Sequence, residues 1–256
     1  MSKRTRYFIT AILLSVGFAA LGFWDSGNQV SSILILSAAT LVLFYWCLWE
    51  GLGRNATLIT LILPVMYTLG VGMFWFLIPS TLMARLPIIA IYAVGIYGLA
   101  SIQNIFVVSV IKKIALERAA RGVNFVLSLF TSFLLFDAVM SLRADVWLVA
   151  LLVALISMFA FLQGLWVSRL GNTLQKEIVI YTLVCTYVLS AIALMLYFWP
   201  VTVVTGSLGL TVSMYVLLGL AQSKLEGRLF KQTAREYLSI GIFVLIIIFL
   251  TTHWRN

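Results

Sequence analysis

The sequence is poor in the residue types that carry out chemistry. Among its 256 residues there are one histidine (His253), two cysteines (Cys47 and Cys185) and eight acidic residues. Zinc and haem sites need clustered imidazole or thiolate ligands, so the composition excludes them, and we expect no metal and no other cofactor. Both cysteines lie inside apolar runs, which excludes a disulfide framework. The sequence also has no phosphate-binding loop and no hydrolase or metalloprotease motif.

Charge is equally scarce. Charged residues make up 10% of the chain and hydrophobic residues 63%. In a soluble domain, charged residues make up about 25% and hydrophobic residues about 45–50%. With a mean hydropathy of +1.11, the polar side chains are too few to coat a globule in water, and the apolar content excludes a disordered chain. We therefore predict an integral membrane protein. Its net charge of +9 is concentrated between the apolar runs, so no nucleic-acid partner is expected.

Apolar runs long enough to cross a bilayer recur along the whole chain. A transmembrane helix needs roughly 20 mostly apolar residues, and the connections are too short for a soluble domain. We predict an all-α, polytopic transmembrane helix bundle of nine spans, forming a single integral membrane domain over residues 1–256. Pro64 is predicted to kink the third span. The predicted spans are residues 7–24, 30–49, 57–78, 86–110, 123–142, 146–168, 178–199, 201–222 and 237–252.

Basic residues are distributed unevenly between the two sets of connections. With nine spans, 14 of the 17 Lys and Arg residues fall on the side of the N-terminus and 3 on the other. Because cytoplasmic loops are enriched in Lys and Arg, we predict a cytoplasmic N-terminus and an external C-terminus in the cytoplasmic (inner) membrane of a cell. The 3 are Arg85, Arg143 and Arg255; the 14 are Lys3, Arg4, Arg6, Arg54, Lys112, Lys113, Arg118, Arg121, Arg169, Lys176, Lys224, Arg228, Lys231 and Arg235.

The ends of the predicted spans have features typical of a membrane interface. All eight tryptophans lie within about one turn of a span end, where Trp rings favour the membrane–water boundary. The connectors at 111–122 and 223–236 are basic and partly amphipathic. We expect them to meet membrane lipids, with anionic headgroups on the cytoplasmic face. A docking surface for a cytosolic protein partner is the alternative.

Several landmarks recur after a shift of about 117 residues. In the fourth span Tyr97 precedes Asn104 by seven residues, and in the eighth Tyr215 precedes Gln222 by the same interval. Each of these spans leads into a basic connector. The pattern predicts a parallel tandem repeat of four spans plus a ninth helix, with units 7–121 and 123–236 and an extra helix at 237–252. Chance alignment of apolar helices is the alternative.

Asp137 is the one clear ionisable residue inside a predicted span. It lies about five residues from the outer end of the fifth span, or about 7 Å deep at 1.5 Å per residue. Ionisable groups in a membrane are candidates for function, here a proton- or cation-binding carboxylate. The alternative is a structural carboxylate that reaches the outer interface or pairs with Arg143 or Arg85.

A second polar group is predicted near the cytoplasmic face. Its members lie at similar depth and would line a polar cavity if their helices packed so that they converge. The alternative is hydrogen bonding between helices, at about 0.6 kcal/mol per contact. These residues are Gln103, Asn104, Asn124, Gln163 and, at a span end, Glu50.

Three segments in the middle of the chain carry a resemblance. They are Ile-Gln-Asn-Ile-Phe at 102–106, the basic connector at 112–121 and Leu-Leu-Phe-Asp at 134–137. Together they resemble an uncharacterised family of polytopic membrane proteins from small-genome bacteria. The resemblance implies a multi-pass membrane fold and carries no activity.

Two classes of function remain open on the sequence. The first is a non-enzymatic membrane scaffold or a small transporter-like protein, whose polar residues mainly hold helices together. The second is a membrane-embedded enzyme that acts on a lipid or isoprenoid-linked substrate, with Asp137 or Asp25 as its carboxylate. The scarcity of catalytic residue types favours the first class.

Overall fold

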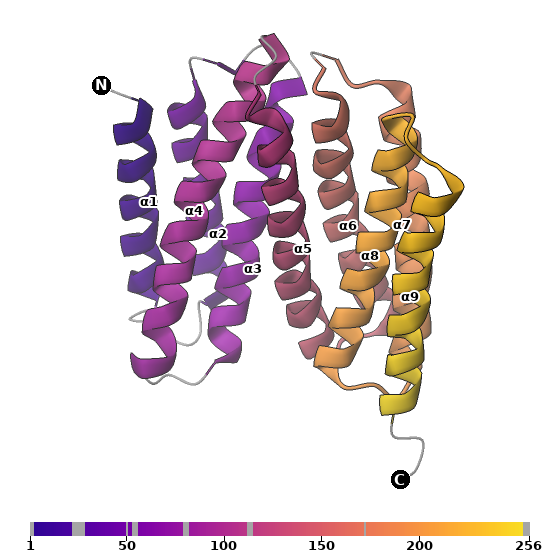
Figure 1. Cartoon of the computed structure of the whole chain (residues 1–256). Helices are drawn as coiled ribbons and strands as arrows, with labels where there is room; N and C mark the ends of the chain where they lie inside the picture. The colour runs from indigo at the N-terminus through magenta and orange to yellow at the C-terminus, as the bar shows by residue number, and fades with distance from the viewer. Residues whose placement is uncertain are drawn as a thin grey trace. The chain divides into compact units, whose positions relative to one another are not determined.

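Regular structure in the described part of the chain is entirely helical. The computed structural model describes residues 3–21, 29–49, 51–52, 56–78, 82–111, 115–171 and 173–252. Within these residues there are nine α-helices and one short 3-10 helix, η3 (Figure 1). The all-α prediction is confirmed, and each predicted span corresponds to one α-helix. The helices are α1 (Lys3–Ala20), α2 (Gln29–Leu48), η3 (Ala56–Leu61), α3 (Ile62–Leu77), α4 (Leu82–Ile111), α5 (Glu117–Ser141), α6 (Val146–Arg169), α7 (Lys176–Tyr197), α8 (Val203–Leu225) and α9 (Lys231–Thr251).

Eight of the helical segments in the described residues are long and apolar enough to cross a membrane. The helix that does not qualify is α1, whose 18 residues include Lys3, Arg4 and Arg6. The protein is therefore a multi-pass membrane protein with eight candidate spans. A ninth crossing by α1 stays a prediction.

Several helices extend beyond the predicted spans into the basic connectors. The fifth helix begins at Glu117 and the ninth at Lys231, about six residues before the apolar runs. Lys, Arg and Glu are good helix formers, so the helix continues where the apolar run stops. In α5 an ion pair between Arg121 and Glu117, one turn apart, supports this first segment.

The chain forms two compact units, which divide within α5. Unit 1 is Met1–Leu127 and unit 2 is Ser128–Asn256. In unit 1, α1 packs against α2 and α4, while α2, α3 and α4 pack against one another. In unit 2, α6, α7 and α8 pack against one another, and α9 packs against α8. Both units therefore contain a group of three mutually packed helices.

A buried hydroxyl network joins three helices of unit 1. The Thr40 and Thr68 hydroxyls of α2 and α3 lie 3.0 Å apart, and Thr68 lies 3.1 Å from the Tyr92 hydroxyl of α4. The neighbouring Tyr67 hydroxyl donates to the carbonyl O of Ile91 (2.9 Å). Because lipid offers polar groups no hydrogen bonds, such contacts fix how the helices pack.

The third span changes its helical type before its proline. η3 precedes α3, and Pro64 is the third residue of α3. In the first turn of an α-helix the backbone N–H has no partner within the helix, so proline fits there without breaking a hydrogen bond. The described irregularity of this span is the change from a 3-10 helix to an α-helix just before Pro64.

Two tryptophans near span ends lie in the protein interior. Trp75 is 2% exposed and meets the edge of the Phe18 ring at 5.0 Å. Trp166 is fully buried, and its indole N–H donates to the carbonyl O of Gly171 (3.1 Å). Trp147, by contrast, is 79% exposed. Position at a span end therefore does not predict whether the side chain points into the protein or away from it.

Substitution of Gly95 is expected to destabilise unit 1. A Cβ atom at Gly95 would overlap the hydroxyl and ring of Tyr67, so Tyr67 would have to move away from Ile91. We expect Gly95→Ala to cost about 1–3 kcal/mol of stability, as other overpacked sites do. Thermal unfolding of the purified protein in nanodiscs measures this. Gly98→Ala on the same helix is the control, because no atom lies within 4 Å of its Cβ position. Equal stability of the two variants would contradict this packing.

Candidate intramembrane polar site

Asp137 lies in α5 and is almost completely buried. It is 7% exposed, and the Ser207 hydroxyl of α8 donates to its Oδ1 atom (3.2 Å). The same Ser207 hydroxyl lies 3.0 Å from the carbonyl O of Val204. This contact joins α5 to α8 within unit 2.

The two arginines proposed as ion-pair partners have other surroundings. In the described residues Arg143 is exposed and forms no ion pair. The guanidinium of Arg85 lies 4.8 Å from the centre of the Trp75 ring, in a cation–π arrangement within unit 1. The described contact of Asp137 is thus a hydrogen bond and not a salt bridge.

Two of the four predicted amide side chains meet within unit 1. The Gln103 Nε2 atom of α4 donates to the Oδ1 atom of Asn124 in α5 (3.4 Å). Both side chains are buried, and the Gln103 Oε1 atom has no hydrogen-bond partner among the described residues. Asn104 follows Gln103 in α4 and is half-buried. The pairing therefore connects α4 to the first part of α5.

Gln163 belongs to the other compact unit. It is fully buried in α6 of unit 2. One residue further along, the carbonyl O of Gly164 accepts from the Gln222 Nε2 atom of α8 (3.0 Å). The predicted amide group is thus divided between the units. Glu50 and Asp25, named with the sequence candidates, lie outside the described residues.

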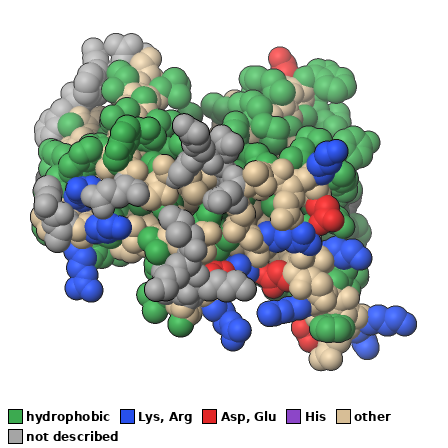
Figure 2. All heavy atoms as spheres, turned by 90° about the horizontal axis from the view of Figure 1, so that it is seen from above, with side chains coloured by type: hydrophobic (Ala, Val, Ile, Leu, Met, Phe, Trp, Pro, Cys, Tyr) green, Lys and Arg blue, Asp and Glu red, His purple; other side chains and the backbone are tan. Residues whose placement is uncertain are grey.

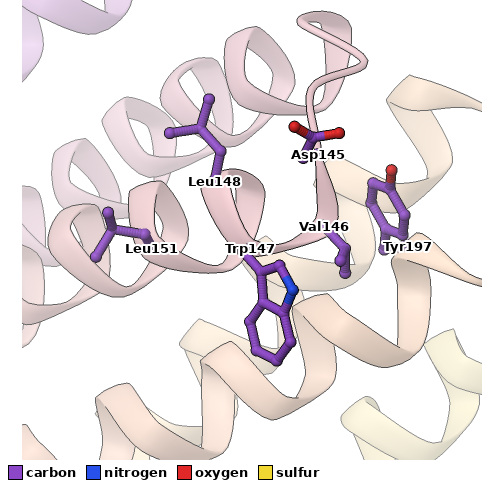
Figure 3. Close-up of a pocket in the computed structure, with 6 residues that line it drawn as sticks. All are labelled: Asp145, Val146, Trp147, Leu148, Leu151 and Tyr197. Carbon is purple, nitrogen blue, oxygen red and sulfur yellow. The ribbon is translucent and has the colours of Figure 1, made fainter.

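A cavity of about 510 Å³ lies where α6 begins and α7 ends in unit 2. The Tyr197 hydroxyl donates to the carbonyl O of Ala144 (3.1 Å) and ties these helix ends together. Figure 3 shows the Asp145 carboxylate and the Tyr197 hydroxyl on the same side of the chain, with the Trp147 ring pointing away. The cavity is lined by Asp145, Val146, Trp147, Leu148, Leu151 and Tyr197.

A second cavity of about 630 Å³ shares Tyr197 with the first. Its lining includes Arg143 and the start of α8, where Thr202 caps the helix by accepting from the backbone N–H of Thr205 (3.3 Å). Gly206 also lines it, next to the Ser207 that contacts Asp137. Asp137 itself is not among the residues that line either cavity.

Arg169 joins three helices at the opposite end of unit 2. Its Nε and Nη2 atoms both donate to the carbonyl O of Leu225, the last residue of α8 (3.1 and 2.9 Å). Its Nη1 atom donates to Gln175 (2.7 Å), and Nη2 lies 3.2 Å from Glu177 in α7. Figure 2 looks onto this end of the helices and shows Lys and Arg side chains interspersed with acidic ones on its right-hand part. A cation at a helix C-terminus is favoured by the helix dipole.

Sequence reasoning counted Arg169 as a loop charge and missed this role. Its position in the last turn of α6 was the available signal, since a guanidinium there can reach free carbonyls. Among the described residues, no group of three or more His, Cys, Asp or Glu side chains could hold a metal ion.

Comparison with known proteins identifies the family of this chain. A family model described as Protein of unknown function (DUF5656) matches residues 48–251. The chain belongs to this family. The DUF5656 match includes the segments at 102–106, 112–121 and 134–137, and it confirms the resemblance to a family without known activity. No curated protein and no solved structure matches the chain.

We predict that Arg169→Lys loosens the junction of α6, α7 and α8. Lysine keeps the charge but cannot direct two N–H groups at the Leu225 carbonyl. A hydrogen bond from a charged donor contributes about 1.5–3 kcal/mol, and the exposure of this side chain reduces the expected loss to about 1 kcal/mol. Thermal unfolding in nanodiscs measures it. Arg235→Lys, at an exposed position on α9, is the matched control; a larger loss for that variant would argue against the Arg169 junction.

Proposed function

We propose that the protein is a non-enzymatic membrane scaffold, whose helix bundle is held together by its intramembrane polar residues. The observation that carries this proposal is that several intramembrane polar side chains form hydrogen bonds to a neighbouring helix. Such contacts join α2 to α3, α3 to α4, α4 to α5, α5 to α8, and α6 to α8.

The cavities support the same function. The linings of the cavities at the α6–α7 end, at the start of α8, between α1 and α4 and between α8 and α9 do not include the intramembrane polar candidates. A transport path would bring water or substrate to those side chains. Four of the five candidates are buried and Asn104 is half-buried, as expected of a bundle with a structural task. The candidates are Asp137, Gln103, Asn104, Asn124 and Gln163.

A transporter-like protein is the second candidate function. The observation that favours it is the burial of Asp137, because a carboxylate deep in a membrane protein is suited to bind a proton or cation. The two functions differ in what they require of this residue. A transporter needs a group that titrates, whereas a scaffold needs only an acceptor for the Ser207 hydroxyl.

Asp137→Asn separates these functions. Asparagine keeps an acceptor oxygen but cannot titrate, so the scaffold predicts stability close to wild type and full complementation of a strain that lacks the gene. Asp137→Leu loses the hydrogen bond and is expected to cost about 0.6–1.7 kcal/mol. Ser207→Ala is the control that removes the donor and keeps the carboxylate. A stable, abundant Asp137→Asn protein that fails to complement would overturn the scaffold and favour transport.

We propose the tandem repeat as the origin of the bundle. The mutually packed helices α2, α3 and α4 of unit 1 have the same order as α6, α7 and α8 of unit 2. This agreement supports the shift of about 117 residues, as does the division of the chain at Leu127, near the predicted boundary of the repeats.

We also propose that the basic ends meet anionic headgroups on the cytoplasmic face of the cell membrane. Leu229 and Phe230 are 39% and 67% exposed between Arg228 and Lys231. Apolar side chains flanked by cations suit the boundary between acyl chains and headgroups. This arrangement requires a cytoplasmic N-terminus and an external C-terminus.

Cysteine labelling tests this orientation and the ninth crossing together. Both native cysteines are buried, so a Cys47→Ala and Cys185→Ala background is suitable. We expect Lys3→Cys and Arg228→Cys to react with a membrane-impermeant maleimide only after the cells are opened. Arg143→Cys and Arg255→Cys should react in intact cells. Labelling of positions 3 and 255 from the same side would show that α1 does not cross and that the nine-span topology is wrong.

A further inference from the structure

A narrow apolar groove runs between α1 and α4 of unit 1. Its volume is about 600 Å³. Small residues of α1 and Ala93 of α4 form part of its wall, and larger apolar side chains flank them. The two helices run in opposite directions (Figure 1), with Phe18 stacked on Tyr92 at 4.4 Å. The lining residues are Phe8, Ala11, Ile12, Ser15, Val16, Ala19, Ile89, Ala93, Val94 and Tyr97.

The dimensions of the groove fit one hydrocarbon chain. From Phe8 to Ala19 the helix rises about 16 Å, which is close to half of the roughly 30 Å hydrocarbon core. A volume of about 600 Å³ over this length gives a cross-section of about 40 Å². A helix with its side chains is about 10–12 Å wide, too wide to enter such a groove. An acyl chain, which spans one leaflet, matches the length of the groove and is narrow enough to enter it.

The polar end of the groove suits an anionic headgroup. Arg4 precedes Phe8 by four residues, so it lies on the same face of α1, one turn nearer the N-terminus. Arg4 is exposed, whereas the guanidinium of Arg6 lies 5.8 Å from the centre of the Trp46 ring on α2. Because α4 runs antiparallel to α1, Tyr97 is the lining residue of α4 nearest this end, and it is 41% exposed.

We propose that this groove is a binding site for an anionic phospholipid. One acyl chain lies along α1 and α4, and the phosphate meets Arg4 near the Tyr97 hydroxyl. The lipid would order the contact between α1 and α4, and so the beginning of the bundle. The site depends only on unit 1, so it holds whether or not the protein acts as a scaffold.

Photocrosslinking in nanodiscs tests the site. The probes are phosphatidylglycerol and phosphatidylcholine that carry the same diazirine-labelled acyl chain, each mixed into phosphatidylcholine nanodiscs at low fraction. We expect phosphatidylglycerol to label peptides from α1 and α4 about five-fold more than phosphatidylcholine does, which corresponds to about 1 kcal/mol for one arginine at the surface. Arg4→Gln should remove this preference.

Variants that fill the groove provide the second arm. Ala93→Phe and Ala19→Phe each place a ring in the groove, from opposite walls. Each variant should abolish labelling of α1 and α4. The test therefore remains possible if one of the two variants fails to fold. The matched controls are Leu13→Phe, at a 53% exposed position of α1 outside the lining, and Arg235→Gln on α9. Equal labelling by both lipids, labelling that persists in folded groove-filling variants, or crosslinks between α1 and α4 peptides of two chains would overturn the proposal.

Discussion

The absence of water around the helices is the constraint on which the rest of this structure depends. In lipid a polar side chain must find its hydrogen-bond partner within the protein. The Thr40, Thr68 and Tyr92 hydroxyls satisfy one another at the centre of unit 1, and Asp137 receives the hydroxyl of Ser207 in unit 2. Apolar side chains pack equally well against lipid or protein, so these few polar contacts select one arrangement of helices among many of similar apolar area.

The sequence predicts the helices well because a membrane makes hydropathy nearly decisive. An apolar run of about 20 residues has few options other than a helix, and each predicted run corresponds to one α-helix. The ends are less predictable, since the helix continues through basic residues such as those of α5 and α9. The 3-10 segment before Pro64 was also not predictable, because hydropathy does not distinguish one helical type from another.

The candidate site was predictable only in part. Asp137 and the amide residues stood out in the sequence because polar residues are rare in apolar runs. The sequence does not show, however, toward which neighbour each helix turns these side chains. The partner of Asp137 lies 70 residues away, and Gln163 belongs to a different compact unit from Gln103. Trp75 and Trp166 illustrate the same limit. Their positions near span ends were evident from the sequence, but their burial depends on which neighbours their helices meet.

The Arg169 junction has a consequence for how the bundle responds to acidity. A guanidinium stays protonated at every physiological pH, and its main acceptor is a backbone carbonyl, which does not titrate. The hydrogen bonds from Arg169 of α6 to the last residue of α8 therefore do not depend on the titration of either partner. A competing ligand for the guanidinium, such as a phosphate, would release the Leu225 carbonyl and allow this end of unit 2 to rearrange.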